Sequence, residues 1–318
     1  MISEFELIDR FFSQPVRNAK VGVGDDAAVI APSAGHDLVI TTDTLVSGVH
    51  FLPDHDPFAL GHKVLAVNLS DLAAMGARPH WVMLAITLPQ VNEQWLSAFS
   101  DGFLDLARQH ELDLIGGDTT QGPLAFTVTA MGEVVAGKAL RRNQASVGDE
   151  LWVSGQIGSA ALALRHLRGD VRLKGRDLEA CMARLEKPVA RVELGRELVD
   201  VASSAIDVSD GLVADAGHIG ERSGVGIEIN YAQIPTVAEI AHLKGDQQVR
   251  EALLTGGDDY ELLFTAPAAA TVQLDSISGQ LGLALTRIGR VVTGRGIRVL
   301  DESGGLVEIG AGGYEHFA

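Results

Sequence analysis

Aspartate residues beside glycine, or at the ends of predicted strands, are the residues here whose types and spacing could do chemistry. Together with Asp71 inside a predicted helix, they occur in short segments at residues 22–26, 41–43, 68–71, 116–119, 207–211 and 256–261. Mg²⁺ prefers oxygen ligands and keeps several waters, so one carboxylate from each of several segments is enough to hold it. Carboxylates gathered in this way repel one another unless a cation neutralises them. The pattern therefore predicts a divalent-cation site built from several segments.

Asp71 is the most informative of these carboxylates because its surroundings are apolar. It lies in residues 64–75, where most neighbours are Val, Leu, Ala or Met. It follows Asn68 by three residues, which places both side chains on one face of a helix. A buried Asp is rare unless it is paired or binds a metal. Pairing with Lys63 or Arg78 is the structural alternative to a metal-binding role.

Each segment taken alone also has an ordinary structural explanation. Asp beside Gly is common in turns, and Asp25 and Asp26 could form a solvated loop or cap a helix. Arg142 would then be a solvated charge, His50 a polar residue near a strand end, and Tyr314 a packing residue of the carboxyl terminus. The prediction of a cation site therefore depends on the whole set of segments.

Local patterns predict the elements that must position these carboxylates. A capping box at Ser3 and Glu6 begins a helix, and Asp56-Pro57 begins another that continues to Met75 and ends at Gly76. Further helices are predicted at residues 92–110 and 159–167, and a helical region at 177–201. Strands are predicted at 27–30, 38–41, 80–88, 112–115, 124–135, 150–153, 205–208, 226–230, 260–265, 287–292 and 297–300. Several of the acidic segments are thus expected just after a strand ends.

The polar, Gly-flanked segment at residues 138–149 is the best candidate for a domain boundary. It divides the 318 residues into a first domain at 1–137, a linker at 138–149 and a second domain at 150–318. Each domain is long enough to have its own core. Because strands and helices alternate in both, the predicted fold class is α/β (α+β) with two domains of similar size.

Composition excludes several classes of function. The formal net charge of −17 argues against nucleic acid as a partner, since a phosphate backbone requires clustered Lys and Arg. The lone Cys181 excludes an intrachain disulfide and a metal site of several thiolates. The sequence has no apolar run of about 18 residues that could span a membrane, and its acidic start does not look like a signal peptide. We therefore expect a cytoplasmic protein with no membrane segment.

In their order along the chain, the acidic segments resemble the motifs of the thiamine-monophosphate kinase family. The matching stretches are GVGDDAAVI (22–30), TTDTLVSGVHF (41–51), VNLSDLAAMGA (67–77), LIGGDTTQGPL (114–124), IDVSDGL (206–212), GGDDYELLF (256–264) and GYEHF (313–317). The resemblance implies a fold shared with aminoimidazole ribonucleotide synthetase and selenophosphate synthetase. In that fold an amino-terminal sheet-and-helix domain dimerises, and a carboxyl-terminal α/β domain completes the substrate site.

The resemblance also implies an activity, the ATP-dependent phosphorylation of thiamine monophosphate to thiamine diphosphate. It implies a homodimer in which ATP and several Mg²⁺ ions bind between the two domains. We expect a direct in-line transfer of the γ-phosphoryl group, because the acceptor phosphate has a second pKa near ~6 and needs no general base at neutral pH. The alternatives are another ATP-using synthetase of the same superfamily, or a non-catalytic relative that binds nucleotide or divalent cations. The segments at 256–261 and 313–317 favour the kinase, since they would not be expected in the other synthetases.

Carried over position by position, the resemblance assigns roles to particular residues. The implied metal ligands are Asp26, Thr41, Thr42, Asp43, Asp71, Asp118, Asp207 and Asp210, and the implied catalytic residues among them are Asp43, Asp71, Asp118 and Asp207. The implied nucleotide contacts are Gly117, Asp118, Arg142 and Ser209, and the implied thiamine-monophosphate contacts are His50, Asp258 and Tyr314. Asp258 stands where relatives often have Glu and Tyr314 where some have Trp, which leaves details of substrate contact open.

Overall fold

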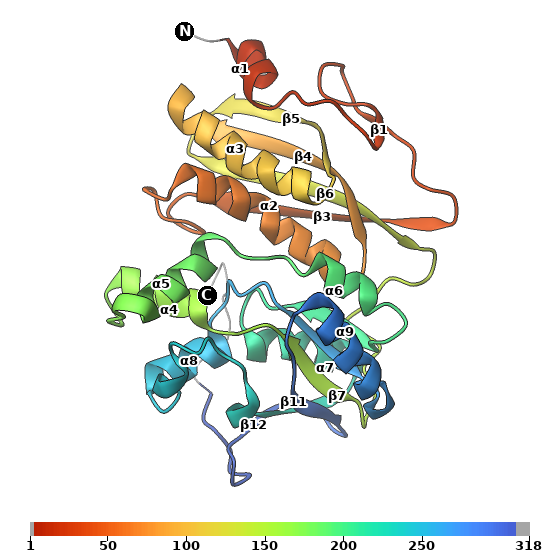
Figure 1. Cartoon of the computed structure of the whole chain (residues 1–318), viewed down its shortest axis with the longest axis vertical. Coiled ribbons are helices and arrows are strands. Elements are labelled where there is room, and N and C mark those ends of the chain that lie inside the picture. The colour runs from red at the N-terminus through yellow and green to blue at the C-terminus, as the bar shows by residue number, and fades with distance from the viewer. Residues whose placement is uncertain (1–2, 310–318) are drawn as a thin grey trace. The chain divides into compact units, whose positions relative to one another are not determined.

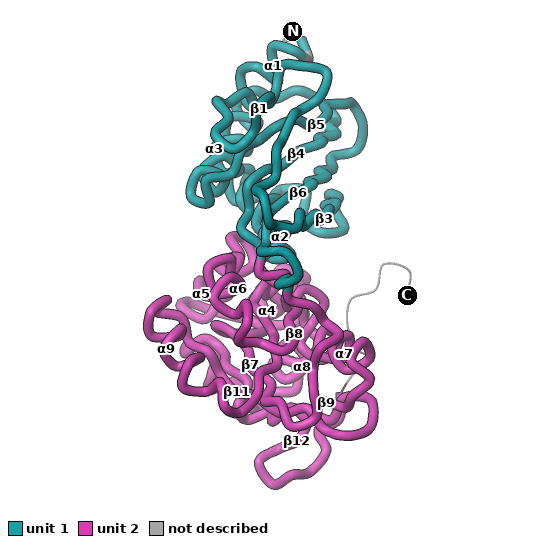
Figure 2. The backbone as a smooth tube through the Cα atoms, turned by 90° about the vertical axis from the view of Figure 1, so that its right-hand side faces the viewer, with its two compact units in different colours: residues 1–72, 77–139 teal, residues 73–76, 140–318 magenta. Residues whose placement is uncertain are grey.

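The computed structural model describes residues 3–309 and divides the chain into two units. Unit 1 contains the described residues up to Leu72 together with Ala77–Ala139, and unit 2 contains Ala73–Gly76 and the described residues from Leu140 onward (Figure 2). Both units mix helices with strands, which confirms the predicted fold class. The chain enters unit 2 inside the segment predicted as a linker, and Ala145 of that segment packs in the core of unit 2.

A four-stranded sheet forms the framework of unit 1. Its order is β3 (His36–Val46), β6 (Ala125–Val135), β4 (Arg78–Leu88) and β5 (Asp113–Gln121). β5 is parallel to β4, and the other neighbouring strands are antiparallel. Two helices, α2 (Pro57–Ala74) and α3 (Glu93–Gln109), cover one face of this sheet (Figure 1).

The two helices of unit 1 approach each other closely because each has a glycine at their contact. A Cβ atom at Gly61 would lie 2.1 Å from the carbonyl oxygen of Phe99, and one at Gly102 would lie 1.9 Å from that of Phe58. Phe99 in turn stacks on Phe126 of β6, with ring centroids 4.5 Å apart. Dense packing of this kind leaves little freedom to shift, so α2 has a fixed position against the sheet.

The opposite face of the sheet is covered at one end by a short ribbon of β1 (Ala19–Val21) and β2 (Val29–Ile30). A small core beneath the ribbon consists of Trp81, Ile115 and Met131. The buried carboxylate of Asp113 accepts hydrogen bonds from the successive backbone N–H groups of residues 17–19. These bonds attach the start of the ribbon to β5.

Unit 2 is built on a six-stranded sheet in the order β12-β9-β11-β7-β10-β8, in which only the β12–β9 pair is parallel. The strands are β7 (Glu150–Ser154), β8 (Ser204–Asp207), β9 (Gly226–Asn230), β10 (Leu262–Ala266), β11 (Leu285–Val292) and β12 (Gly296–Leu300). The helices are α4 (Ser159–Arg168), α5 (Gly175–Glu186), α6 (Val192–Glu197), α7 (Leu212–Ser223), α8 (Gln247–Thr255) and α9 (Thr271–Leu281), with 3₁₀ turns at Tyr231–Gln233, Ala241–Leu243 and Ala268–Ala270. One hydrophobic core joins this sheet to α4, α5, α7 and α8.

Local signals placed the helix ends well. The capping box of Ser3 and Glu6 begins α1 (Glu4–Phe11), and α2 begins at the predicted Pro57. The region predicted to be helical at 177–201 contains two helices, α5 and α6, because Pro188 lies between them and cannot donate a helical hydrogen bond. Among the described residues, no helix is long and apolar enough to cross a membrane.

Two strands of unit 1 are much longer than predicted. β3 pairs with β6 from His36 to Val46, and β5 pairs with β4 as far as Gln121. The Thr41-Thr42-Asp43 and Gly116–Thr119 segments therefore lie inside strands, and the expectation that they follow strand ends was wrong. The cause is pairing with distant strands, which offsets the low strand propensity of Gly and Asp.

Candidate active site

In unit 1, the contact between α2 and β3 brings four of the polar residues together. The Thr41 hydroxyl donates a hydrogen bond to the carboxylate of Asp71. The backbone N–H of Asp43 donates to Oδ1 of Asn68 at 3.2 Å, and Nδ2 of Asn68 donates to the carbonyl of Val64 at 3.2 Å. Asn68 is fully buried and Asp71 is half-buried. The predicted common face of Asn68 and Asp71 is therefore confirmed, and it is the face that packs on β3.

Alternate residues of β3 point to opposite faces of the sheet. Thr41 contacts α2, whereas Thr42 and Thr44 are exposed on the other face. There the Thr42 and Thr129 hydroxyls lie 2.9 Å apart, as do those of Thr44 and Thr127. Thr42 is thus separated from the Asp71 carboxylate by the backbone of its own strand.

Asp118 lies on β5, at the opposite edge of the sheet from β3. The strand register places it in one row with Ala85, Thr127 and Thr44, on the face away from α2. Three strand spacings separate β5 from β3, which is about 14 Å at the usual spacing. Asp118 is exposed. The fold of unit 1 therefore holds Asp43 with Asp71 but does not bring Asp118 to them.

The remaining predicted residues of unit 1 lie in loops. Asp25 and Asp26 are exposed, and the Asp25 carboxylate accepts a hydrogen bond from the N–H of Asp26 at 2.9 Å. His50 follows β3, and its Nδ1 accepts a hydrogen bond from the N–H of Val46 at 3.0 Å. This bond requires an Nδ1 without a proton, so a neutral ring carries its proton on Nε2. The imidazole of His50 then offers a donor and not a free basic nitrogen.

In unit 2, the acidic segments at 207–211 and 256–261 lie side by side as an irregular continuation of the β8–β10 pair. The N–H groups of Asp258 and Tyr260 donate to the carbonyls of Ser209 and Val208 at 3.0 and 2.8 Å. A Cβ atom at Gly257 would lie 2.1 Å from the Ser209 carbonyl oxygen, so only glycine permits this approach. Two motifs about fifty residues apart in the sequence thus form one surface.

The first two turns of α7 add two residues that the sequence prediction missed. Oδ2 of the buried Asp215 accepts the N–H groups of residues 209–211 at 3.1 to 3.2 Å. Burial, and then the negative charge of Asp210, raise the pKa of the Asp215 carboxyl to about 7. Ligand atoms of Asp210, Asp215 and His218 all lie within 4.8 Å of one another, a set that could hold a metal ion. The available signal was the spacing of Asp215 and His218, one helical turn apart.

Three other residues were predicted for the site, Arg142, Asp207 and Tyr314. Asp207 is the last residue of β8 and is buried. Arg142 is exposed, and its carbonyl accepts a hydrogen bond from the Ser223 hydroxyl at 3.0 Å. Tyr314, with the GYEHF ending, lies outside the described residues.

Comparison with known proteins places both units in one family. Residues 24–134 match AIR synthase related protein, N-terminal domain, and residues 146–302 match AIR synthase related protein, C-terminal domain. A thiamine-monophosphate kinase of Salmonella typhimurium is 44% identical over 99% of this chain and 98% of its own length.

Solved structures agree with these matches. The thiamine-monophosphate kinase of Stenotrophomonas maltophilia K279a has a TM-score of 0.86 at 48% identity, over 94% of this chain and 96% of that one. AaThiL complexed with AMPPCP and TMP has a TM-score of 0.79 at 31% identity, over 99% of this chain and 97% of that one.

Proposed function

Since the chain belongs to the thiamine-monophosphate kinase family, we propose that it transfers the γ-phosphoryl group of ATP to thiamine monophosphate, giving thiamine diphosphate and ADP. The observation that carries this proposal is the similarity to AaThiL, a relative that was solved with AMPPCP and TMP and that matches 99% of this chain. Carboxylates of the kind that phosphoryl transfer requires occur in both units, as Asp71 beside Thr41 in unit 1 and as Asp210 and Asp215 beside His218 in unit 2.

The residues of both units have the donor chemistry of a magnesium site. Carboxylate and hydroxyl oxygens predominate, as Mg²⁺ prefers. We assign metal binding to Asp26, Thr41, Thr42, Asp43, Asp71, Asp118, Asp207 and Asp210. Bound Mg²⁺ would neutralise the phosphates and align the attacking and leaving oxygens. The hydrogen bond of Thr41 to Asp71 supports part of this assignment, because it orients the carboxylate.

For the nucleotide, we assign contacts to Gly117, Asp118, Arg142 and Ser209. For thiamine monophosphate, we assign them to His50, Asp258 and Tyr314. His50 suits binding better than proton abstraction, since its Nδ1 already accepts the Val46 N–H.

The acceptor needs no general base in this reaction. A phosphate monoester has a second pKa near ~6, so its attacking oxygen is already largely deprotonated at neutral pH. Direct in-line transfer without a phosphoenzyme follows as the simplest mechanism. It predicts inversion at phosphorus when a chiral thiophosphate is transferred from ATP, and retention would indicate a double displacement.

We also propose a cytoplasmic homodimer formed through unit 1. The sheet face opposite α2 and α3 leaves Ile40 57% exposed and Met83 39% exposed. Met83 lies in one row with the Thr42–Thr129 pair, and Ile40 lies in the next row. Symmetric pairing would cover this face. A solution-scattering mass equal to one chain at all concentrations would contradict the dimer.

A coupled assay of ADP release tests the activity itself. Purified protein with ATP, Mg²⁺ and thiamine monophosphate should release ADP and form thiamine diphosphate. Thiamine and aminoimidazole ribonucleotide precursors serve as control acceptors and should give only background release. A faster reaction with an aminoimidazole precursor would instead indicate a synthetase of the same superfamily.

A further inference from the structure

The segment at 256–261 contains two residues in an unfavourable backbone conformation. Asp258 has φ of +69° and Tyr260 has φ of +52°, in the left-handed region that favours glycine. In the described part of the chain, Glu111 and Asp200 are the other non-glycine residues with positive φ, and each stands alone. Such conformations persist only where the surrounding structure enforces them, and they cluster at functional sites.

The residue between them is held by the start of α4. Both carboxylate oxygens of Asp259 accept the N–H of Gly158, at 2.9 and 2.8 Å. Gly158 is the N-cap of α4, where φ is +85° and a Cβ atom would lie 2.8 Å from a side-chain carbon of Leu253. Asp259 therefore accepts the N–H of a residue that must be glycine, at the closely packed start of α4.

Glu261, the residue that follows Tyr260, is also held in place by hydrogen bonds. Glu261 is 1% exposed, and its Oε2 accepts the Ser154 hydroxyl and Nε of Arg191, both at 2.6 Å. A Cβ atom at Gly155 would lie 2.0 Å from Oε1 of Glu261, so the β7–α4 loop encloses this side chain. Asp259 and Glu261 thus both attach the segment to the same loop, residues 154–158.

The side chains of Asp258 and Tyr260 bond to each other. The Tyr260 hydroxyl donates to Oδ1 of Asp258 at 2.9 Å. We propose that Asp259 is a positioning residue whose attachment to Gly158 holds the left-handed backbone of Asp258 and Tyr260, so that this bonded pair is preorganised for thiamine monophosphate. The proposal rests on the proposed function, in which Asp258 contacts that substrate.

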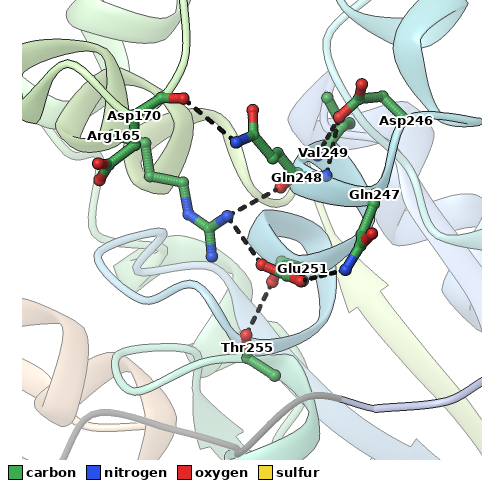
Figure 3. A network of polar contacts seen from close by, with 8 residues as sticks. All are labelled: Arg165, Asp170, Asp246, Gln247, Gln248, Val249, Glu251 and Thr255. Atoms are coloured by element: carbon green, nitrogen blue, oxygen red, sulfur yellow. Dashed lines mark hydrogen bonds and ion pairs between the residues drawn. The ribbon is translucent and has the colours of Figure 1, made fainter.

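A purely structural role for Asp259 gives a different expectation, and the chain offers a matched control for it. Asp246 caps α8 by accepting the N–H groups of Gln248 and Val249 at 2.8 and 3.3 Å (Figure 3). The variants Asp259→Ala and Asp246→Ala therefore each remove a carboxylate from a helix start in unit 2. Of the two substituted residues, only Asp259 has neighbours with positive φ.

The experiment compares these variants with Asp259→Asn and Asp259→Ser by steady-state kinetics and by hydrogen exchange of peptides covering residues 256–261. Asp259→Ala should raise the KM for thiamine monophosphate at least ~10-fold, as expected when a contact group is displaced, and leave the KM for ATP within ~2-fold. Asp259→Asn keeps an acceptor for the Gly158 N–H and should stay within ~3-fold of wild type. Asp246→Ala should lower the melting temperature without changing either KM.

Several outcomes would overturn the proposal. Unchanged exchange at 256–261 in Asp259→Ala would show that the carboxylate does not hold this backbone, and faster exchange with an unchanged KM would show a structural role only. If Asp259→Ala does not fold, Asp259→Ser must show the selective KM increase instead. A wild-type protein that does not phosphorylate thiamine monophosphate would refute the proposed function, and this result is distinct from a failure confined to the variants.

Discussion

The polar groups of the candidate site in unit 1 and in unit 2 are positioned by different physical means. At the α2–β3 contact of unit 1, regular elements hold the polar groups, and side chains such as Thr41 and Asp71 bond to each other across a packed interface. In unit 2, irregular backbone positions the polar groups. The segments at 207–211 and 256–261 are held together by main-chain hydrogen bonds and a close glycine contact. The chemistry of unit 1 should therefore depend on side-chain charge, and that of unit 2 on backbone shape.

The largest expected effect is the loss of charge at Asp71. Asp71→Asn keeps the side-chain shape and an acceptor for the Thr41 hydroxyl, so the melting temperature should change little. Turnover should fall by at least ~10²-fold, the scale of losing one electrostatic element at a transition state.

Asp56→Asn is the control for this prediction, because it makes the same charge change on the same helix. Asp56 caps α2 by accepting the Ala59 N–H at 2.8 Å, and Asn caps helices equally well. Its activity should stay near that of wild type. If Asp71→Asn were folded and fully active, Asp71 would have a structural role and the contrast between the units would be lost.

The second prediction alters backbone shape in unit 2 without changing any charge. Gly257→Ala places a Cβ atom where the Ser209 carbonyl oxygen lies, so the two acidic segments must separate. We expect a stability loss of ~1–3 kcal/mol, typical of overpacking, and a fall in turnover of at least ~10-fold from misplaced groups. Urea unfolding and steady-state kinetics measure the two effects.

Two further alanine variants sharpen this test. A Cβ atom at Gly245 of unit 2 would have no heavy atom within 4 Å, and one at Gly116 of unit 1 would meet only the Met83 side chain at 3.7 Å. Both variants should keep stability close to that of wild type. Equal damage from Gly116→Ala and Gly257→Ala would show that backbone shape matters as much in unit 1.

The sequence could predict the features that depend on local signals, and it could not predict most of those that depend on contacts between distant segments. The helix with Asn68 and Asp71 was predicted because its signals are local, from the Asp56-Pro57 start to the Gly76 end. The extent of β3 and β5 was missed, since it depends on pairing with strands far along the chain. The contact of Asp258 with Ser209 was missed for the same reason. The cluster around Asp215 was missed although its signal is local, since Asp215 and His218 lie one helical turn apart. Family resemblance named many of the acidic residues but not the groups that hold them.

The third prediction concerns ligands. The clustered carboxylates repel one another, so Mg²⁺ with a non-hydrolysable ATP analogue should stabilise the folded protein by about 2.7 kcal/mol at a hundredfold excess over the dissociation constant. Differential scanning calorimetry measures the gain. Asp71→Asn should reduce this stabilisation, and Asp56→Asn should not. An unchanged melting temperature would count against the metal cluster.

Peptides covering the exposed residues 22–26 should also gain hydrogen-exchange protection when the ligands are added.

The smallest expected effect uses Cys181 as a probe confined to unit 2. This thiol on α5 is fully buried, and burial, followed by the nearby Asp177 carboxylate, raises its pKa from 9.0 to about 11. A raised pKa means that the folded state keeps its proton while the unfolded state loses it. The stability due to the neutral thiol is thus fully present below pH 9 and is lost as the pH rises toward 11.

Urea unfolding at pH 8, 9 and 10 under reducing conditions should therefore show wild type losing on the order of 1 kcal/mol relative to Cys181→Ala. The comparison cancels the titration of Lys and Tyr, which both proteins share. Because Cys181 is the lone cysteine of the sequence, the difference reports on unit 2 and not on unit 1. Parallel pH profiles for the two proteins would mean that the thiol ionises equally well in the folded state, and that the core around α5 is open to solvent.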